Sequence, residues 1–377
     1  GTVDIALNGE IALPDVDYGD STAYIELPEG IYDVEIFPDG STTAAISALD
    51  VELTGGVDYT AIAIGDGTNQ DLSLKLLVDD NTAPAAGKFK LRLGHLAPFA
   101  ADPDTTADVR LDDGTVILDD VDFGDVAGYL ELDAGEYDLK ITTPDGATTL
   151  INFAPVTFTE GQIVSAFAVG DGTVQDLGGF ALPSGAVGFF LPLEARLQVA
   201  HLAPFADPGT VDIKLNGITA LEDVNYGDST AYIELPEGSY LVEIVPDGAT
   251  DPAISKTVDL VGGNDYTAIA VGDITNQPLD LLALLDDNTA PTTGNFKLRL
   301  GHLAPFDEIL ADTTADVRLD DDTVILDDVV FGAVDSYREL PAGEYDLKIT
   351  TPDGVTTLID LAPVIFAEGD IVSAFAV

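Results

Sequence analysis

A short stretch ending in His-Leu-Ala-Pro-Phe occurs three times in this chain, and these stretches contain all three of its histidines. They occupy residues 90–99, 197–205 (which reads Leu-Gln-Val-Ala before its histidine) and 298–306. In the first, Leu91 and Leu93 alternate with basic residues, which is the period of a strand, and Pro98 then ends the ladder because it has no amide hydrogen. Each copy is therefore predicted to be the opening strand of a structural module, so the fold must be a repeated one.

The repeat has a period of 208 residues and contains two related modules. Residues 1–5 recur as residues 209–213, which is 209 − 1 = 208 positions later. Within that period, the second histidine follows the first by 106 residues and the third follows the second by 101. This order predicts four modules, A, B, A′ and B′, in which A′ resembles A and B′ resembles B. Their expected bounds are 1–86 for A, 87–195 for B, 196–294 for A′ and 295–377 for B′.

Strand periodicity and turn signals recur at corresponding places in all four modules. In module A, Tyr32, Val34 and Ile36 alternate with Asp33 and Glu35, which is the pattern of a strand with one wet face. Short strands separated by turns every 8–12 residues or so are typical of a sandwich. The sequence therefore predicts an all-β fold, a tandem array of four Ig-like antiparallel β-sandwich modules whose first and last members are truncated. Module A′ is expected to have strands at 196–203, 210–216, 218–224, 229–235, 239–245, 253–260 and 265–271.

The two ends of the chain depart from the repeat. Module A begins at its second strand, because nothing before Gly1 corresponds to residues 196–208. Module B′ stops at Val377, which corresponds to Val169 of module B. We therefore expect the chain to be a slice of a longer tandem array. If Gly1 were a true terminus, module A would have an open sheet edge, an aggregation hazard or a docking site, although no spare strand to exchange is visible at the other end.

The charge of the chain is extreme and limits its partners. It has 68 acidic residues against 14 lysines and arginines, a net charge of −54. Such a surface repels nucleic acid and anionic membranes. It suits either a protein adapted to concentrated salt, where the screening length falls to about 3 Å at 1 M, or a surface that collects divalent cations. Because the acids are spread over every module, general salt adaptation and a halophilic source are favoured.

The junction between modules B and A′, residues 178–193, is uncharged for sixteen residues in a very acidic protein. Glycines and two prolines interrupt it, and it is short for a membrane helix, so no membrane span is expected in this segment. Two interpretations remain: a hairpin extension packed on its own modules, or a patch where neighbouring chains meet. The candidate interface residues are Phe180, Phe189, Phe190 and Leu191.

Several segments together resemble a known family. They read Tyr-Thr-Ala-Ile-Ala-Ile-Gly at 59–65, Asp-Asp-Asn-Thr-Ala-Pro at 79–84, and Gly-Lys-Phe-Lys-Leu-Arg-Leu-Gly-His-Leu-Ala-Pro-Phe at 87–99. The chain resembles the secreted bacterial and archaeal modules of domain of unknown function 4397, nearly over its whole length. That resemblance implies a β-sandwich, an extracellular or cell-surface location and a tandem arrangement, and it implies no activity. The family usually has Ser-Pro-Asp after the histidine, where this chain has Ala-Pro-Phe.

The chemistry-bearing residues have structural interpretations as strong as functional ones. His95, His201 and His302 share a strand face with leucines or valines, so each is expected to be a buried repeat residue bonded to a backbone carbonyl, with metal ligation as the alternative. Without cysteine there is no thiol nucleophile or thiolate metal site, and no serine lies in a Gly-x-Ser-x-Gly elbow. Calcium, or another cation, is the alternative to solvated turn carboxylates at Asp66, Asp102, Asp104, Asp108 and Asp171.

These observations favour a non-catalytic extracellular structural or adhesive protein, a rod or filament of tandem modules from a salt-adapted microbe. Extending such a stalk requires only more copies of the same unit. Its expected partners are neighbouring copies in a filament or surface array, and no cofactor is expected. The alternative is a calcium-assisted cell-surface adhesin, a binding array that recognises a glycan or another surface protein.

Overall fold

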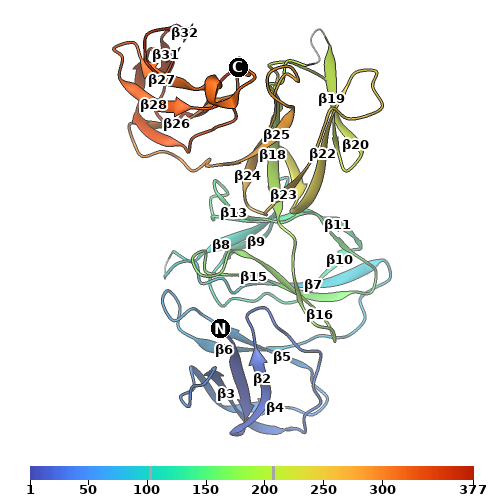
Figure 1. Ribbon diagram of the computed structural model, residues 1–377. Helices are drawn as coiled ribbons and strands as arrows, with labels where there is room; N and C mark the ends of the chain where they lie inside the picture. The colour runs from blue at the N-terminus through green and yellow to red at the C-terminus, as the bar shows by residue number, and fades with distance from the viewer. Residues whose placement is uncertain (102–103, 206–208) are drawn as a thin grey trace. The chain divides into compact units, whose positions relative to one another are not determined.

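The computed structural model describes residues 1–101, 104–205 and 209–377, and the chain divides into two compact units, Gly1–Glu194 and Ala195–Val377. Strands dominate both units (Figure 1). The helical content of the described residues is one 3₁₀ helix, η1 (Leu310–Thr313), and none of it is long and apolar enough to cross a bilayer. The predicted all-β fold class is confirmed.

Module A′ shows the sandwich most completely. Its strands are β18 (Glu194–His201), β19 (Thr210–Leu215), β20 (Ile218–Asn225), β21 (Ile233–Pro236), β22 (Gly238–Pro246), β23 (Ile254–Leu260), β24 (Asp265–Val271) and β25 (Asp280–Asp286). One sheet has the order β21-β18-β24-β25 and the other β20-β19-β22-β23. Alternate apolar residues of both sheets meet between them, and Leu197, Ile213 and Ile244 are fully buried there. The alternating apolar residues of the strands therefore form one core between the two sheets.

The sheets differ from the expected all-antiparallel pairing in one respect. The opening strand β18 pairs with β24 in parallel, with Arg196 opposite Asp265 and His201 opposite Ala270. Parallel and antiparallel strands share the same two-residue side-chain period, so the sequence pattern does not distinguish them. The strand β25 was also not expected; it pairs antiparallel with β24 along the other edge.

Module B repeats this plan with a longer first sheet. Its strands are β7 (Lys88–His95), β8 (Ala107–Leu111), β9 (Val116–Val121), β10 (Leu130–Asp133), β11 (Gly135–Tyr137), β12 (Leu139–Thr142), β13 (Thr149–Asn152), β14 (Val156–Phe158), β15 (Ile163–Val169), β16 (Gly178–Pro183) and β17 (Phe189–Phe190). The sheet orders are β10-β7-β15-β16-β17, β13-β12-β8-β9 and β11-β14, with β7 and β15 parallel. Phe89 anchors the core, stacked 4.5 Å from Phe158 and edge-on to Tyr137.

Module B′ has the same core with fewer strands. They are β26 (Asn295–His302), β27 (Ala315–Leu319), β28 (Val324–Val329), β29 (Arg338–Pro341), β30 (Gly343–Tyr345), β31 (Leu347–Thr350), β32 (Thr357–Asp360), β33 (Val364–Phe366) and β34 (Ile371–Ala376). The sheet orders are β29-β26-β34, β28-β27-β31-β32 and β30-β33. Phe296 and Phe366 stack at 4.5 Å, so the aromatic core of module B recurs.

Module A contains one complete sheet and part of a second. Its strands are β1 (Val3–Leu7), β2 (Glu10–Val16), β3 (Gly30–Pro38), β4 (Ile46–Leu53), β5 (Tyr59–Ile64) and β6 (Ser73–Val78). The complete sheet has the order β2-β1-β3-β4, and β5 pairs with β6. The predicted bounds of the four modules stay predictions, since the structure divides the chain only into the two units of two modules each.

Candidate functional site: contacts between paired modules

The three histidines lie in the interior, each at the end of an opening strand. His95, His201 and His302 are at most 3% exposed. Nε2 of His95 lies 2.7 Å from the carbonyl oxygen of Thr105, and Nε2 of His302 lies 2.7 Å from that of Thr313. Because a carbonyl oxygen only accepts, Nε2 is the donor in both bonds. Among the described residues neither ring nitrogen of His201 has such a partner. This geometry suits the predicted structural role.

Acidification is expected to destabilise the protein through these histidines. Burial lowers the pKa of His95, His201 and His302 below 6.5. An unfolded histidine takes up a proton near pH 6.5, whereas the folded one resists it, so the free energy of unfolding is highest above that pH and falls as the pH drops through it. Melting temperatures from about pH 8 to about pH 5, in molar KCl to screen the carboxylates, measure this. The variant His302→Gln should show a shallower decline, and a flat profile for the parent chain would contradict the expectation.

Asp108, a candidate cation ligand, is fully buried at a bulge between β8 and β9. One carboxylate oxygen accepts a hydrogen bond from Nη2 of Arg110 at 2.5 Å, and the other accepts the backbone N–H of Asp120 at 2.8 Å. Asp120 has a φ of +49°, the left-handed conformation of the bulge. The other modules repeat this bond at 3.0, 3.3 and 2.8 Å in the pairs Asp4–Asp15, Asp212–Asp223 and Asp316–Asp328. The carboxylate thus supports a bulge in every module.

Two groups of three carboxylates surround these bulges in modules B and B′. The oxygens of Asp108, Asp119 and Asp120 come within 4.8 Å of one another, as do those of the equivalent group Asp316, Asp327 and Asp328. The buried member of each group is already paired with an arginine at 2.5 Å. Only two exposed carboxylates per group therefore remain for a cation. Among the other predicted ligands, Asp104 is exposed in the loop after His95, and Asp102 lies outside the described residues.

Asp66 and Asp171, the last candidate ligands, each close a tight turn. Oδ1 of Asp171 accepts the backbone N–H groups of Thr173, Val174 and Gln175 at 2.7, 2.7 and 3.0 Å. The N–H groups of Gln175 and Thr173 hold the pKa of Asp171 at about 2. Oδ1 of Asp66 accepts three backbone N–H groups in the same way, from Thr68, Asn69 and Gln70. In both aspartates, Oδ1 is therefore already hydrogen-bonded to the backbone of its own turn.

A buried arginine with several hydrogen bonds lies between modules A and B in the first unit. Nη2 of Arg92, on β7, donates to Oδ1 of Asp79 at 2.6 Å, and Nη1 donates to the carbonyl oxygen of Val78 at 3.0 Å. Within its own module, Nε donates to Oγ of Ser165 at 2.9 Å, and the guanidinium lies 4.7 Å from the ring centroid of Tyr129. The side chains of Arg92 and Asp79 are 4% and 1% exposed. We call this contact the junction ion pair.

The carboxylate of the junction ion pair also accepts hydrogen bonds from other residues of module A. Its other oxygen, Oδ2 of Asp79, accepts the hydroxyls of Tyr24 and Thr60, each at 2.7 Å. An apolar cluster that includes Ile64 of module A and Leu96 of module B adds to the contact. A buried ion pair in which both carboxylate oxygens are also hydrogen-bonded is a geometry in which removal of one partner is costly.

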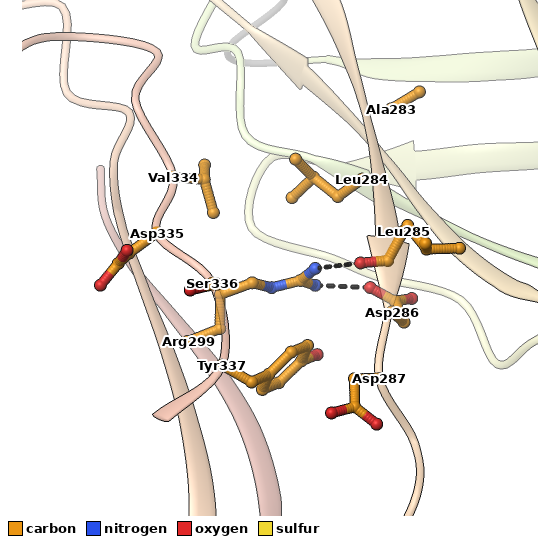
Figure 2. A pocket seen from close by; sticks show the side chains of 10 residues that line it. All are labelled: Ala283, Leu284, Leu285, Asp286, Asp287, Arg299, Val334, Asp335, Ser336 and Tyr337. Atoms are coloured by element: carbon orange, nitrogen blue, oxygen red, sulfur yellow. Dashed lines mark hydrogen bonds and ion pairs between the residues drawn. The ribbon is translucent and has the colours of Figure 1, made fainter. Parts of the chain in front are cut away.

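The second unit repeats the junction ion pair between modules A′ and B′. Nη2 of Arg299, on β26, donates to Oδ1 of Asp286 at 2.6 Å, and their side chains are 4% and 0% exposed (Figure 2). The guanidinium lies 4.6 Å from the ring centroid of Tyr337. Oδ2 of Asp286 accepts the hydroxyls of Tyr232 and Thr267. Burial, together with this hydrogen bond to a carboxylate, raises the pKa of Tyr232 to about 12.

A crevice of about 380 Å³ lies beside this second pair (Figure 2). Its walls come from β25, from β26 and from the loop that contains Tyr337. Asp286, Asp287 and Asp335 line it, and its arginine is already bonded to Asp286. The crevice therefore has no unpaired cationic side chain in its lining that could bind an anionic ligand.

A turn in the first module of each unit makes a second contact with the opening stretch of the next module. In the first unit, Nδ2 of Asn69 donates to the carbonyl oxygen of Pro98 at 3.0 Å, and Nε2 of Gln70 donates to that of Ala100 at 3.0 Å. The second unit repeats both bonds, from Asn276 to Pro305 at 2.7 Å and from Gln277 to Asp307 at 2.8 Å. We call residues 66–70 and 273–277 the Asn-Gln turns. In both units, the proline of the His-Leu-Ala-Pro-Phe motif and a residue just after the motif thus provide carbonyl oxygens that the preceding module binds.

Three residues of these contacts are replaced where module B precedes module A′, although Gln175 retains the glutamine of the turn. Ser184 stands in B where A has Asp79, and Val174, which is 82% exposed, stands where A has Asn69. Gln198 stands in A′ where B has Arg92, and its amide donates to the carbonyl oxygen of Thr230 in its own module at 2.7 Å. This agrees with the division of the chain into two compact units. Comparing the copies position by position could have revealed this pairing of modules; the sequence reasoning did not.

The apolar junction 178–193 forms a hairpin through β16 and β17 in the first unit. The ring of Phe190 packs 5.3 Å from that of Phe180 and 5.9 Å from that of Tyr18 in module A. The backbone N–H of Gly188 donates to Oγ of Ser21, also in module A, at 2.6 Å. Leu191 is buried, whereas Phe189 and Phe190 are 50% and 48% exposed. The hairpin therefore packs on modules of its own unit, and its use as a surface between chains stays a prediction.

Comparison with protein families agrees with this architecture. The family described as "Domain of unknown function (DUF4397)" matches three stretches, residues 1–102, 99–206 and 195–309. The chain belongs to this family. Each matched stretch ends just after a His-Leu-Ala-Pro-Phe motif, and the first and third matches thus include a segment that the preceding module binds. The resemblance noted from the sequence is confirmed. No curated protein matches the chain.

Solved structures with some similarity to the DUF4397 chain are remote. The Bacillus anthracis TIE protein is 12% identical, with 99% of this chain and 66% of that one covered and a TM-score of 0.16. BcpA, the major pilin subunit of Bacillus cereus, is 13% identical in its D312A form, covering 77% and 98% of the two chains, with a TM-score of 0.14. The pilus adhesin SpaC from Lactobacillus rhamnosus GG is 10% identical, covering 100% and 55%, with a TM-score of 0.13. The chain thus spans less than two thirds of the first and last of these, and at such TM-scores the similarity carries no functional argument.

Proposed function

We propose that this chain is a non-catalytic extracellular stalk segment, built from DUF4397 modules and adapted to concentrated salt. The observation that carries the proposal is the junction ion pair, which joins two modules in each unit through Arg92–Asp79 and Arg299–Asp286. A repeated, buried contact between consecutive modules, with both carboxylate oxygens hydrogen-bonded, is what a load-bearing or spacing element requires. Its partners would be neighbouring copies in a filament or surface array.

Salt affects the surface and the junctions of this protein differently. The net charge of −54 makes like charges repel on every face that water reaches, and ions screen that repulsion. Exposed charges are screened over about 3 Å at 1 M, whereas buried pairs are screened much less. The junction ion pairs, with side chains at most 4% exposed, are therefore expected to persist in brine. High salt would then stabilise each module and leave the inter-module contacts intact.

Thermal melts across salt series test the proposal. We expect the melting temperature to rise continuously from about 0.1 M to about 2 M in either NaCl or KCl, because screening depends on ionic strength and not on the cation. Millimolar CaCl₂ at fixed ionic strength should add little. Electron micrographs of the full chain and of native material show whether it forms rods, filaments or surface arrays. A melting temperature independent of monovalent salt, together with compact isolated particles, would contradict the stalk proposal.

The calcium-assisted adhesin is the second candidate, and the repeated groups Asp108–Asp119–Asp120 and Asp316–Asp327–Asp328 are the observation that favours it. Calcium prefers several carboxylate oxygens, which these groups supply near one another. A sharp increase in melting temperature at millimolar CaCl₂, lost in the variant Asp119→Asn/Asp120→Asn, would support that role. Such a protein would recognise a glycan or another surface protein.

A further inference from the structure

The crevice of the second unit lies beside a segment in which modules B and B′ differ. Residues 330–341 of B′ differ from residues 122–133 of B at six of twelve positions. The fifteen residues before this segment and the sixteen after it each differ at only one position. Among the six changes, Asp335 and Ser336 line the crevice, where module B has alanine and glycine. Two otherwise similar stretches therefore diverge at a wall of this crevice.

A third change leaves room in the crevice. Ala283 of β25 lines it, where module A has the larger Leu76. The space, about 380 Å³, lies within the range of about 300–1,000 Å³ that is typical of small-molecule sites. Leu284 and Leu285 on one wall face Asp335 on the other (Figure 2), and Leu285 is 61% exposed. The crevice therefore presents an apolar wall and a polar wall to a small ligand.

The charges of the lining are already balanced. Its three carboxylates each bind a basic side chain, in the pairs Asp286–Arg299 at 2.6 Å, Asp287–Lys297 at 2.7 Å and Asp335–Arg338 at 2.5 Å. A cationic ligand would have to compete with these basic partners for a carboxylate. An anionic ligand would meet three carboxylates and no basic side chain that lacks one. The lining therefore discriminates against both signs of charge and favours a neutral ligand.

Hydrogen-bonding groups remain available on the polar wall. Nε and Nη2 of Arg338 both donate to Oδ2 of Asp335, so Oδ1 is left as an acceptor with no partner among the described residues. Ser336, the next residue, is exposed, and its hydroxyl both donates and accepts. A carboxylate oxygen and a hydroxyl on one wall suit a ligand with several hydroxyl groups, because each of these also donates and accepts.

The edge of β25 adds backbone groups to the lining. The N–H of Leu281 donates to Oδ1 of Asp280 at 2.8 Å, outside the ladder with β24. Backbone groups of alternate residues face the same side of a strand, so those of Ala283 also face away from β24. No strand of the described chain lies on that side of β25, whereas Ala181, the corresponding residue of module B, pairs there with Phe189. The N–H and carbonyl groups of the exposed Ala283 are therefore open to a ligand.

We propose that the crevice between β25 and residues 334–337 is a binding site for a neutral saccharide. Hydroxyl groups of the sugar bond to Oδ1 of Asp335, to the hydroxyl of Ser336 and to the backbone of Ala283, and the C–H face of its ring lies on the leucines of β25. This inference gives a site to the glycan recognition that was raised as the second candidate function. It depends neither on the stalk role nor on calcium.

Saturation-transfer NMR on the full chain, in molar KCl with EDTA, tests the site. The probes are the neutral methyl glycosides of glucose, galactose, mannose and N-acetylglucosamine, with glucuronate and glucosamine as charged comparisons. At least one neutral glycoside should receive saturation, strongest at its ring C–H protons. Transfer to none of the probes, or only to the charged sugars, would overturn the proposal. Because EDTA removes calcium, a positive result separates this site from calcium-assisted binding, and a negative one leaves the salt dependence expected of the stalk unaffected.

Variants that carry the residues of the first unit locate the binding. Asp335→Ala/Ser336→Gly should weaken the glycoside by at least about tenfold, and Ala283→Leu should abolish transfer because leucine fills the space. Each introduces what module A or B has at that position, so the fold should persist, which melting temperatures check. The matched control is Ala333→Asp, a change to the module B residue just outside the lining, and it should bind like the parent chain. Parent-like binding by the first two variants, or an equal loss in the control, would show that the crevice is not the site.

Discussion

Replacing Arg92 by methionine is expected to lower the free energy of unfolding of the first unit by about 3–5 kcal/mol. Methionine fills much of the volume of the arginine side chain but leaves the carboxylate of Asp79, 1% exposed, without its counter-ion. An uncompensated buried charge of this kind is among the largest single-site penalties known. Urea unfolding in molar KCl measures the change, and the effect should not diminish at higher salt because the pair is buried.

The matched control is the variant Lys88→Met. Lys88 lies on the same strand as Arg92 and pairs with Asp133 at 3.0 Å. Their side chains are 36% and 87% exposed, so loss of this ion pair should cost less than about 1 kcal/mol. The double variant Arg92→Met/Asp79→Leu should recover only part of the loss. It removes the buried charge, but the hydroxyls of Tyr24, Thr60 and Ser165 and the carbonyl oxygen of Val78 each lose a partner. Equal effects of Arg92→Met and Lys88→Met would show that the junction ion pair does not stabilise the unit.

Replacing Gly272 by alanine is expected to destabilise the second unit by about 2–6 kcal/mol and to loosen its Asn-Gln turn. Gly272 directly precedes this turn and has a φ of +91°, where an L side chain is strained. A Cβ there would lie 2.2 Å from the backbone carbonyl oxygen of Pro278, which cannot move aside without opening the turn. Because the turn carries Asn276 and Gln277, their bonds to the next module should weaken too. Urea unfolding measures the first effect, and hydrogen exchange in residues 303–307 measures the second.

Gly263→Ala isolates the steric part of this effect. Gly263 has a φ of +74° but nothing within 4 Å of a Cβ, so alanine there brings only backbone strain of about 1–3 kcal/mol. Hydrogen exchange in residues 303–307 should stay at the parent rate. If the two variants were equally stable and exchanged alike, the contact between turn and opening stretch would have no energetic role.

Arg92 and the turn after Gly272 both contact the neighbouring module of their unit, so we expect a pair of modules to be the unit of stability in this protein. In each unit, one buried ion pair and one Asn-Gln turn connect the first module to the second. Three of their residues differ where B precedes A′, at Ser184, Val174 and Gln198. A 208-residue repeat is then the natural length for adding or removing material, because it preserves every such contact.

Much of the fold could be predicted from the sequence because its signals are local or repeated. Two-residue alternation, as in Tyr32 to Ile36, specifies a strand with one buried face, and near-identical segments 208 residues apart specify a tandem array. The burial of the histidines also agrees with their position on an apolar strand face. These inferences need no knowledge of which strands are neighbours.

The sequence by itself thus determined the strand class, the period and the family of this chain, because each depends on residues close together or on copies of them. Only the tertiary structure decided that β18 lies parallel to β24, that Asp108 supports a bulge, and that Arg92 meets Asp79. Each of these depends on which segments the folded chain brings together, and side-chain period is the same for every such arrangement. With 68 acidic residues in the chain, composition could not indicate which few carboxylates would be buried against an arginine. That choice follows from packing, since a carboxylate loses its water only where a neighbouring module covers it.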